Sequence, residues 1–167
     1  MLSYIIFPLM VGMISVANNM TIVLYTEKWL PIVPFIYIVC IEAMISVVGT
    51  VTLQAIKSYG RSDLMLKMEA IKKPIMLVAL LIAMQFGIYA IALTLPLNTI
   101  LELIINGSVL NRLIGYNLKS QLFDCIPALC YSLIMGIASY SIGYIKCNLI
   151  ILLILQVLGG FFSYIVI

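Results

Sequence analysis

Charged and metal-binding side chains are scarce in this sequence. Only 9% of its 167 residues are charged, and histidine is absent. A soluble domain carries about 25% charged residues, so this chain lacks the polar surface that contact with water requires. The four cysteines form no CxxC pair, and without histidine the sequence offers no set of zinc ligands. We therefore expect no bound metal and no cofactor.

Catalytic motifs are missing as well. The sequence has no Ser/His/Asp set, no P-loop and no GxGxxG pattern. We expect no catalytic residues, and we do not expect an enzyme. The net charge of +3 does not predict a nucleic-acid partner, because the positive residues lie between apolar segments, where membrane topology explains them better.

Apolar residues dominate what remains. They make up 65% of the chain, and the mean hydropathy is +1.24. Runs of about 20 apolar residues are long enough to cross a bilayer as helices. The expected fold is therefore an all-α membrane protein, with residues 1–167 forming a single bundle of about six transmembrane helices in a lipid bilayer. The expected spans are residues 2–24, 34–56, 74–93, 97–113, 122–145 and 149–167.

Proline and tryptophan predict where these spans begin and end. Trp29 follows the first span at the level where an indole ring contacts lipid headgroups. Pro34 and Pro74 are expected to open the second and third spans, because proline suits the first turn of a helix. Residues 94–98 (TLPLN) are expected to form a tight outer turn before the fourth span.

Positive charge gathers in one short stretch. Residues 57–73 (KSYGRSDLMLKMEAIKK) hold seven of the fifteen charged residues, and five of these seven are positive. A short loop with such an excess stays on the cytoplasmic side of a membrane. This loop and a second positive loop, residues 112–119, are predicted to be inside, which places both termini in the cytoplasm. The inner loops hold Lys57, Arg61, Lys67, Lys72, Lys73, Arg112 and Lys119, and the outer loops hold Lys28 and Lys146.

Amide side chains mark one face of the first span. Asn18 and Asn19 share that face with Gly12 and Ser15 at helical spacing. Such a face either packs on neighbouring helices through small and amide residues or lines a hydrated pathway. Both interpretations are open at this point.

Glu42 is the acidic residue that falls deepest within a predicted span. An ionised carboxylate at bilayer depth costs about 2.5–3.5 kcal/mol on insertion scales, so it is a candidate functional residue by default. The alternative is that Glu42 is hydrated near the outer interface. Gln54, Gln85 and Glu102 are further pathway candidates, with hydrogen bonding between helices or simple hydration as the alternative.

Several motifs resemble one family of transporters. Residues 7–12 (FPLMVG), Lys28-Trp29 and the apolar run from Pro34 resemble the start of the C-terminal half of polysaccharide-repeat-unit flippases. Gly60, Arg61, Asp63 and Lys67 are similar to the Gly-Arg-x-Asp-x-x-x-Lys pattern of that family's inner loop. Gln121, Leu122, Asp124 and Pro127 are similar to the Gln-Leu-x-Asp-x-x-Pro pattern that opens a later helix.

The resemblance implies a function and a set of partners. It implies one helix bundle of a two-bundle flippase in the bacterial cytoplasmic membrane. Such a protein moves undecaprenyl-pyrophosphate-linked oligosaccharide to the outer leaflet for surface polysaccharide synthesis. Family members are well over twice as long, so the chain is expected to be a half-length fragment that needs the missing N-terminal bundle or a second copy of itself. Glu42 and Glu102 are candidate carriers of a coupling ion.

Two other functions fit the same composition. The chain could be a non-transport scaffold subunit of a membrane complex. It could also be a proton-conducting subunit of a respiratory complex, where short six-span chains with few charges also occur. Replacing Glu42 and Glu102 by glutamine distinguishes these alternatives, because proton conduction depends on the carboxylates and a scaffold does not.

Overall fold

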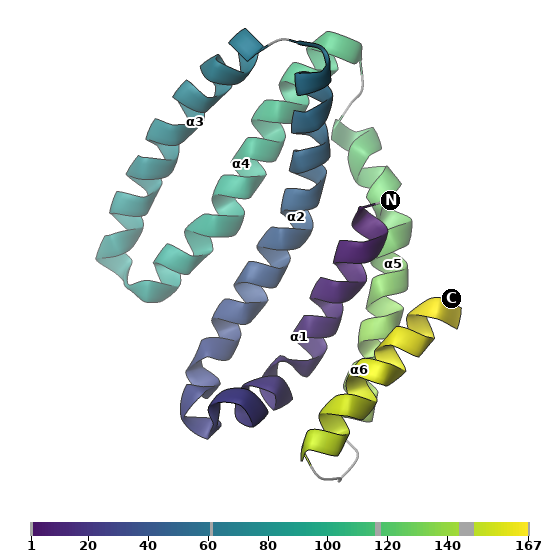
Figure 1. Cartoon of the computed structure of the whole chain (residues 1–167). Coiled ribbons are helices and arrows are strands. Elements are labelled where there is room, and N and C mark those ends of the chain that lie inside the picture. The colour runs from purple at the N-terminus through teal and green to yellow at the C-terminus, as the bar shows by residue number, and fades with distance from the viewer. Residues whose placement is uncertain (1, 61, 116–117, 144–148, 167) are drawn as a thin grey trace. The chain divides into compact units, whose positions relative to one another are not determined.

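The computed structural model describes residues 2–60, 62–115, 118–143 and 149–166. Every regular element in these ranges is helical, which confirms the all-α prediction (Figure 1). The elements are α1 (Ser3–Tyr25), the 3₁₀ helix η1 (Glu27–Ile32), α2 (Val33–Ser58), α3 (Ser62–Ala83), the 3₁₀ helix η2 (Met84–Phe86), α4 (Ile88–Ile114), α5 (Leu118–Ile142) and α6 (Leu149–Val166).

Four stretches of the described chain are long and apolar enough to cross a membrane. A bilayer core needs about 20 predominantly apolar residues in a helix. The four stretches are Ser3–Tyr25, Glu27–Ser58, Ile88–Leu113 and Leu118–Ile142, and a shorter apolar helix covers Ile151–Tyr164. This agrees with a helical membrane protein.

The chain divides into two compact units, which we describe separately. One unit is residues 41–125, and the other is residues 1–40 together with residues 126–167. The division falls within α2 and within α5.

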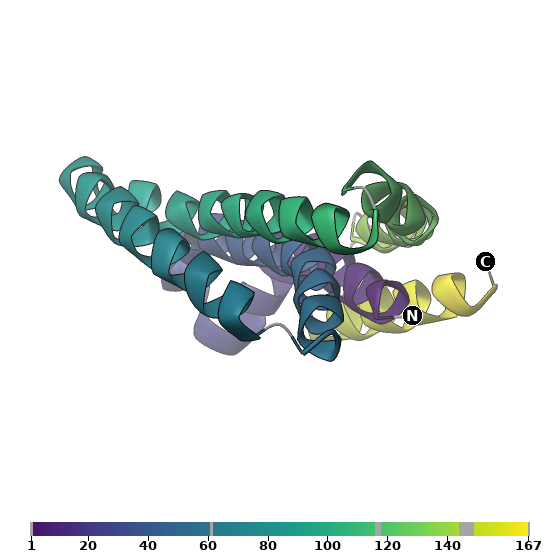
Figure 2. The same cartoon turned by 90° about the horizontal axis from the view of Figure 1, so that it is seen from above.

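The unit of residues 41–125 is built around a helical hairpin. Helix α3 packs on α4, and η2 joins them (Figure 1). Figure 2 shows the same two helices next to each other from above. Its apolar core lies where Ile56 of α2, Met68 of α3 and Leu110 of α4 meet. Burial of these three side chains holds the end of α2 against the hairpin.

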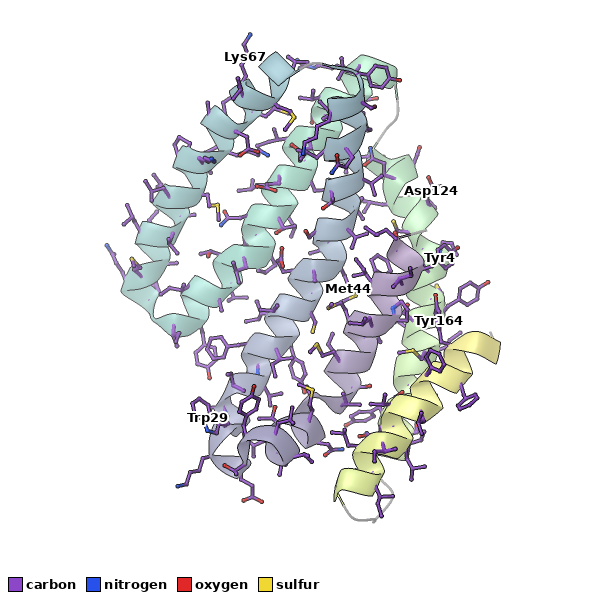
Figure 3. The ribbon with its side chains drawn as sticks, in the orientation of Figure 1. Tyr4, Trp29, Met44, Lys67, Asp124 and Tyr164 are labelled. Atoms are coloured by element: carbon purple, nitrogen blue, oxygen red, sulfur yellow. The ribbon has the colours of Figure 1, made fainter. Side chains whose placement is uncertain are left out.

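The unit of residues 1–40 and 126–167 pairs the first helix with the last. Helix α1 packs on α6, and the Tyr164 hydroxyl donates a hydrogen bond of 2.5 Å to the backbone carbonyl of Tyr4 (Figure 3). The start of α1 therefore lies beside the end of α6, and the two helices are antiparallel. Gly136 of α5 lies directly against the Val11 side chain of α1, so α5 approaches α1 closely.

The structure corrects the predicted turn between the third and fourth spans. We expected the third span at residues 74–93, the turn at residues 94–98 and the fourth span from residue 97. Instead α3 ends at Ala83, the turn lies at η2 and Gly87, and α4 runs unbroken from Ile88 to Ile114. Pro74 is also inside α3 rather than at its start.

Backbone geometry explains this difference. Gly87 has a φ of 95°, which a residue without Cβ adopts easily, so the chain reverses there. Pro96, on which the predicted turn depended, lies inside α4. It removes one backbone donor, and helices in a membrane protein tolerate that loss when neighbouring groups and local adjustments satisfy the backbone. Thr94 and Thr99 flank Pro96, and their hydroxyls lie 2.7 Å from the carbonyl of Ile91 and 3.1 Å from the carbonyl of Leu95, both of which precede the proline.

Candidate functional site

A stripe of polar side chains runs along α4. Thr94, Asn98, Glu102 and Asn106 recur every fourth residue, which places them on one face of the helix. Thr94, Asn98 and Asn106 are buried. Because buried polar groups are unfavourable unless they are hydrogen-bonded, this face must meet polar partners.

Lys72 of α3 supplies the charge opposite this stripe. Its side chain is only 6% exposed, and its ammonium lies 2.8 Å from Glu69 Oε1, 3.4 Å from Asn106 Oδ1 and 4.0 Å from Glu102 Oε1. Glu69 and Asn106 are within hydrogen-bond distance of the ammonium, whereas the Glu102 carboxylate interacts with it only through charge. The negative charges of the two carboxylates more than balance the positive charge of Lys72. A buried lysine without such partners would be strongly destabilising.

A cavity of about 100 Å³ adjoins this ion cluster. A site of that size has room for a few water molecules. Its polar lining consists of Glu69, Lys72, Lys73, Asn98 and Glu102, and its apolar lining comes from both helices of the hairpin. The cluster is therefore a polar site, with room for water beside it, in a largely apolar hairpin.

The cluster changes the titration of one carboxylate. The hydrogen bond from Lys72 is the main reason that the pKa of Glu69 lies below its ordinary value, and the positive charges of Lys72 and Lys73 act in the same direction. Partial burial opposes them. Glu69 lies in the charged first half of α3, before the apolar residues that follow Pro74.

Glu42 of α2 reaches the same helix. The Thr99 hydroxyl donates a hydrogen bond of 3.0 Å to Glu42 Oε1, and Glu42 is half-buried. Thr99 is three residues before Glu102, so the two residues are neighbours on the surface of α4. Within residues 41–125, side chains from α2 and α3 thus bind to one side of α4.

A second polar contact joins α2 to α5. The side chains of Thr52 and Gln121 are 2.7 Å apart, and both residues are buried. The Thr52 hydroxyl also donates to the carbonyl of Val48 at 2.9 Å. Among the described residues, the Gln121 amide nitrogen is buried without a hydrogen-bond partner. This residue belongs to the Gln-Leu-x-Asp-x-x-Pro pattern of the sequence.

Gln156 organises the polar contacts of the other unit. The Asn19 amide donates to Gln156 Oε1 at 2.9 Å, and Gln156 Nε2 donates to the carbonyl of Ser139 at 3.3 Å. In return the Ser139 hydroxyl donates to the carbonyl of Gln156 at 3.2 Å. The Asn19 side chain of α1 and the Ser139 carbonyl of α5 therefore meet at the buried Gln156 amide of α6.

A groove with a volume of about 560 Å³ lies next to this amide. Its walls are mainly apolar, with Leu9 and Met13 from α1 and Phe161 from α6. Gln156 and Ser139 also line it, and Tyr4 and Tyr164 lie along it. The groove combines an apolar wall with a few hydrogen-bonding groups, as ligand sites often do.

The predicted site residues do not form one site. Asn19, Glu42 and Glu102 join the contacts described above. Asn18, Gln54 and Gln85 are exposed, and Gln85 lies in η2 rather than in the middle of a span. Sequence reasoning missed Lys72, Asn106 and Gln156 as site residues. The spacing of four residues between Asn98, Glu102 and Asn106 was a signal for Asn106. Gln156 is the single amide residue of α6, which was a signal for that residue.

The chain is distantly similar to two bacterial proteins of polysaccharide biosynthesis. It is 23% identical over 144 residues to the teichuronic acid biosynthesis protein TuaB of Bacillus subtilis, which covers 86% of this chain and 30% of TuaB. It is 23% identical over 141 residues to the lipopolysaccharide biosynthesis protein WzxC of Escherichia coli, which covers 83% of this chain and 29% of WzxC. The chain thus spans about three tenths of the length of these relatives. No protein-family model and no solved structure matches it.

Proposed function

We propose that this chain is part of a transporter that flips lipid-linked oligosaccharide across the bacterial cytoplasmic membrane. The lipid carrier would be undecaprenyl pyrophosphate, and the product would serve surface polysaccharide synthesis. The observation that carries the proposal is the alignment of more than four fifths of the chain with two polysaccharide biosynthesis proteins. The four apolar stretches and the flippase-like motifs support it.

The polar groups of the helices fit this task. A sugar headgroup cannot cross hydrocarbon unaided, because each buried hydroxyl without a partner costs several kcal/mol, roughly 2–7 depending on the reference state. A transporter must therefore offer polar side chains at membrane depth. The polar stripe of α4 and the amides Asn19 and Gln156 are the candidates. Asn18, Gln54 and Gln85 remain candidates because they are exposed and could line a pathway.

Transport would require more than this chain. Alternating access in transporters arises when one helix bundle rocks against another. Because the chain matches only about three tenths of each relative, we propose that the working transporter contains either another set of helices or a second copy of this chain. The proposed orientation has both termini and the loop at residues 57–73 in the cytoplasm.

Reconstitution tests the transport proposal. The purified chain, alone and together with any protein that co-purifies with it, is placed in liposomes that contain a fluorescent lipid-linked oligosaccharide. A membrane-impermeant quencher then measures the fraction of the lipid that reaches the outer leaflet. We expect flipping by an oligomer or a two-protein complex and none by a monomer. Transport by a demonstrated monomer contradicts the requirement for a partner.

A genetic experiment tests the function separately. Deleting the gene should cause lipid-linked oligosaccharide to accumulate in the inner leaflet and should abolish the corresponding surface polysaccharide. Normal surface polysaccharide in the deletion strain rules out the proposal. A pH-sensitive dye in the same liposomes detects proton conduction, which is the alternative that Glu42 and Glu102 suggest.

A further inference from the structure

Exposed cations gather at one end of the unit of residues 41–125. The three core residues of this unit come from α2, α3 and α4 and meet near the end of α2. Each core residue has an exposed cation one or two positions away in the sequence, and these cations are Lys57, Lys67 and Arg112. Since the core residues are in contact, the three helices bring one cation each to the same end of the unit (Figure 1).

The acidic residues of this region are too few to neutralise these cations. Residues 57–73 contain five positive and two negative residues. One of the two negative residues, Glu69, is bonded to the buried Lys72 at 2.8 Å. Among the residues that the structure describes, Lys57, Lys67 and Arg112 form no ion pair. Their positive charges are therefore open to a partner.

The first half of α3 adds apolar side chains to this surface. Leu66 is 73% exposed and Ile71 is 59% exposed. Lys67 is next to Leu66 and four residues before Ile71, so the three side chains share an exposed side of the helix. Met68 and Lys72, which are buried, mark the opposite side. Lys67 extends away from α3 (Figure 3).

Neither water nor hydrocarbon suits such a mixed surface. Exposed Leu66 and Ile71 are unfavourable in water, and an ionised lysine is costly in hydrocarbon. Helix α3 is not among the four stretches of the described chain that are long and apolar enough to cross a membrane. The headgroup layer of a bilayer accommodates both kinds of side chain, because apolar groups reach the acyl chains there while ammonium groups meet phosphates.

We propose that Lys57, Lys67 and Arg112, together with Leu66 and Ile71, form a binding surface for acidic phospholipids. The partner is a lipid with a net negative headgroup, such as phosphatidylglycerol, because its charge complements the three cations and its acyl chains complement the two apolar residues. Each lysine or arginine near such a lipid surface increases the affinity about fivefold. The proposal depends on a membrane location and not on the proposed transport function.

Lipid binding by the purified chain tests the proposal. Native mass spectrometry of the protein released from detergent counts bound lipids in parallel titrations with phosphatidylglycerol and phosphatidylcholine. The wild-type chain should bind phosphatidylglycerol about tenfold more tightly, because phosphatidylcholine carries no net charge. Equal affinities of the wild-type chain for the two lipids overturn the proposal, whatever the variants do.

Substitution of the cations locates the surface. Lys67→Gln should weaken the binding of phosphatidylglycerol about fivefold, and Lys57→Gln/Lys67→Gln/Arg112→Gln should bring the affinities for the two lipids within about twofold of each other. The matched control is Lys28→Gln, since Lys28 is an exposed lysine of η1, outside this unit. It should leave the affinity unchanged. Equal losses in Lys67→Gln and Lys28→Gln would show that binding follows net charge alone and would overturn the site.

Two further arms distinguish a lipid surface from a site for a soluble anion. Leu66→Ser/Ile71→Ser should weaken the binding of phosphatidylglycerol several-fold, because these side chains contact the acyl chains. Inorganic pyrophosphate at the same concentration as the lipid should not displace it. Displacement by pyrophosphate, or an unchanged affinity of the Leu66→Ser/Ile71→Ser variant, would assign the cations to a soluble anion and overturn the proposal.

Discussion

At the scale of single residues, position on the helix decides what each polar group does. Asn18 and Asn19 are adjacent and chemically identical, yet Asn18 is exposed and Asn19 is bonded to Gln156. Successive residues of a helix point about 100° apart, so only one of the two can face α6. The sequence showed both amides but could not show which one has a partner.

Removing Asn19 should therefore destabilise the protein more than removing Asn18. Asn19→Ala leaves the buried Gln156 without one hydrogen bond, and we expect a loss of about 0.6–1.7 kcal/mol, the range found for hydrogen bonds between membrane helices. Asn18→Ala should change the free energy of unfolding by less than about 0.5 kcal/mol. Chemical unfolding in detergent measures both, and equal losses would contradict the assigned contact.

Glu69 should make stability depend on pH. Its pKa is lower in the folded protein than in the unfolded chain, mainly because of the Lys72 hydrogen bond. The stabilising contribution is therefore complete above the ordinary glutamate pKa and is lost as the pH falls through the lower, folded-state value. Since the side chain is 38% exposed, solvent screening limits the contribution to below about 1 kcal/mol.

The comparison of Glu69→Gln with the wild type measures this contribution. The free energy of unfolding of the variant should be lower than that of the wild type at pH 7. This difference in free energy should vanish as the pH falls below the pKa of Glu69 in the folded protein. Urea unfolding between pH 7 and pH 3.5 follows the difference. If the difference in the free energy of unfolding stays constant over this pH range, the ion pair between Glu69 and Lys72 is contradicted.

At the scale of elements, glycines determine where helices end and how closely they approach. Gly60, Gly87 and Gly115 have positive φ angles and follow α2, η2 and α4. The turn was predicted at residues 94–98, around Pro96, but the chain turns at Gly87. Proline was the weaker signal, because a membrane helix can continue through it, whereas a left-handed φ at Gly87 cannot be accommodated inside a helix.

Alanine at Gly87 should destabilise the α3–α4 hairpin. A Cβ at a φ of 95° is strained, and a residue with a side chain held in this sparsely populated backbone region costs roughly 1–3 kcal/mol. Gly49→Ala is the matched control, because Gly49 lies inside α2 and an added Cβ meets nothing within 4 Å. It should stabilise the protein by about 0.5–1 kcal/mol. Thermal unfolding of both variants should give shifts of opposite sign.

The contact between α1 and α5 gives a second test at this scale. A Cβ at Gly136 would overlap Val11 Cγ1, so Gly136→Ala should lose about 1–3 kcal/mol by overpacking. Adding Val11→Ala makes room and should recover most of the loss. A double-mutant cycle measures this coupling. Additive losses would mean that the two helices do not touch at this point.

At the scale of the whole molecule, many large apolar side chains are exposed, whereas several polar side chains are buried. Ile5, Val51, Leu77, Phe123 and Phe161 are all more than half exposed. Asn106, Ser139 and Gln156 are at most 2% exposed. A soluble protein rarely exposes contiguous apolar surface on this scale. This distribution suits lipid as the surrounding medium, in which polar groups must find partners inside the protein.

Cysteine labelling tests the orientation in that medium. In a chain whose four native cysteines have been replaced, Lys67→Cys should react with an impermeant maleimide only after the cells are permeabilised. Lys28→Cys should react in intact cells. Both native lysines are exposed, so burial does not limit either reaction, and Lys67 extends away from α3 (Figure 3). Labelling of position 67 in intact cells would reverse the proposed topology.

The sequence by itself determined the class of protein and most of its helices. Composition and the lengths of the apolar runs are additive properties of the chain, so they predict membrane helices without knowledge of any contact. Only the tertiary structure decided the partners of the polar groups. Lys72 and Glu102 are thirty residues apart, and Asn19 and Gln156 are separated by 137. Such pairs depend on which helix faces meet, and that is set by packing over the whole chain rather than by local pattern.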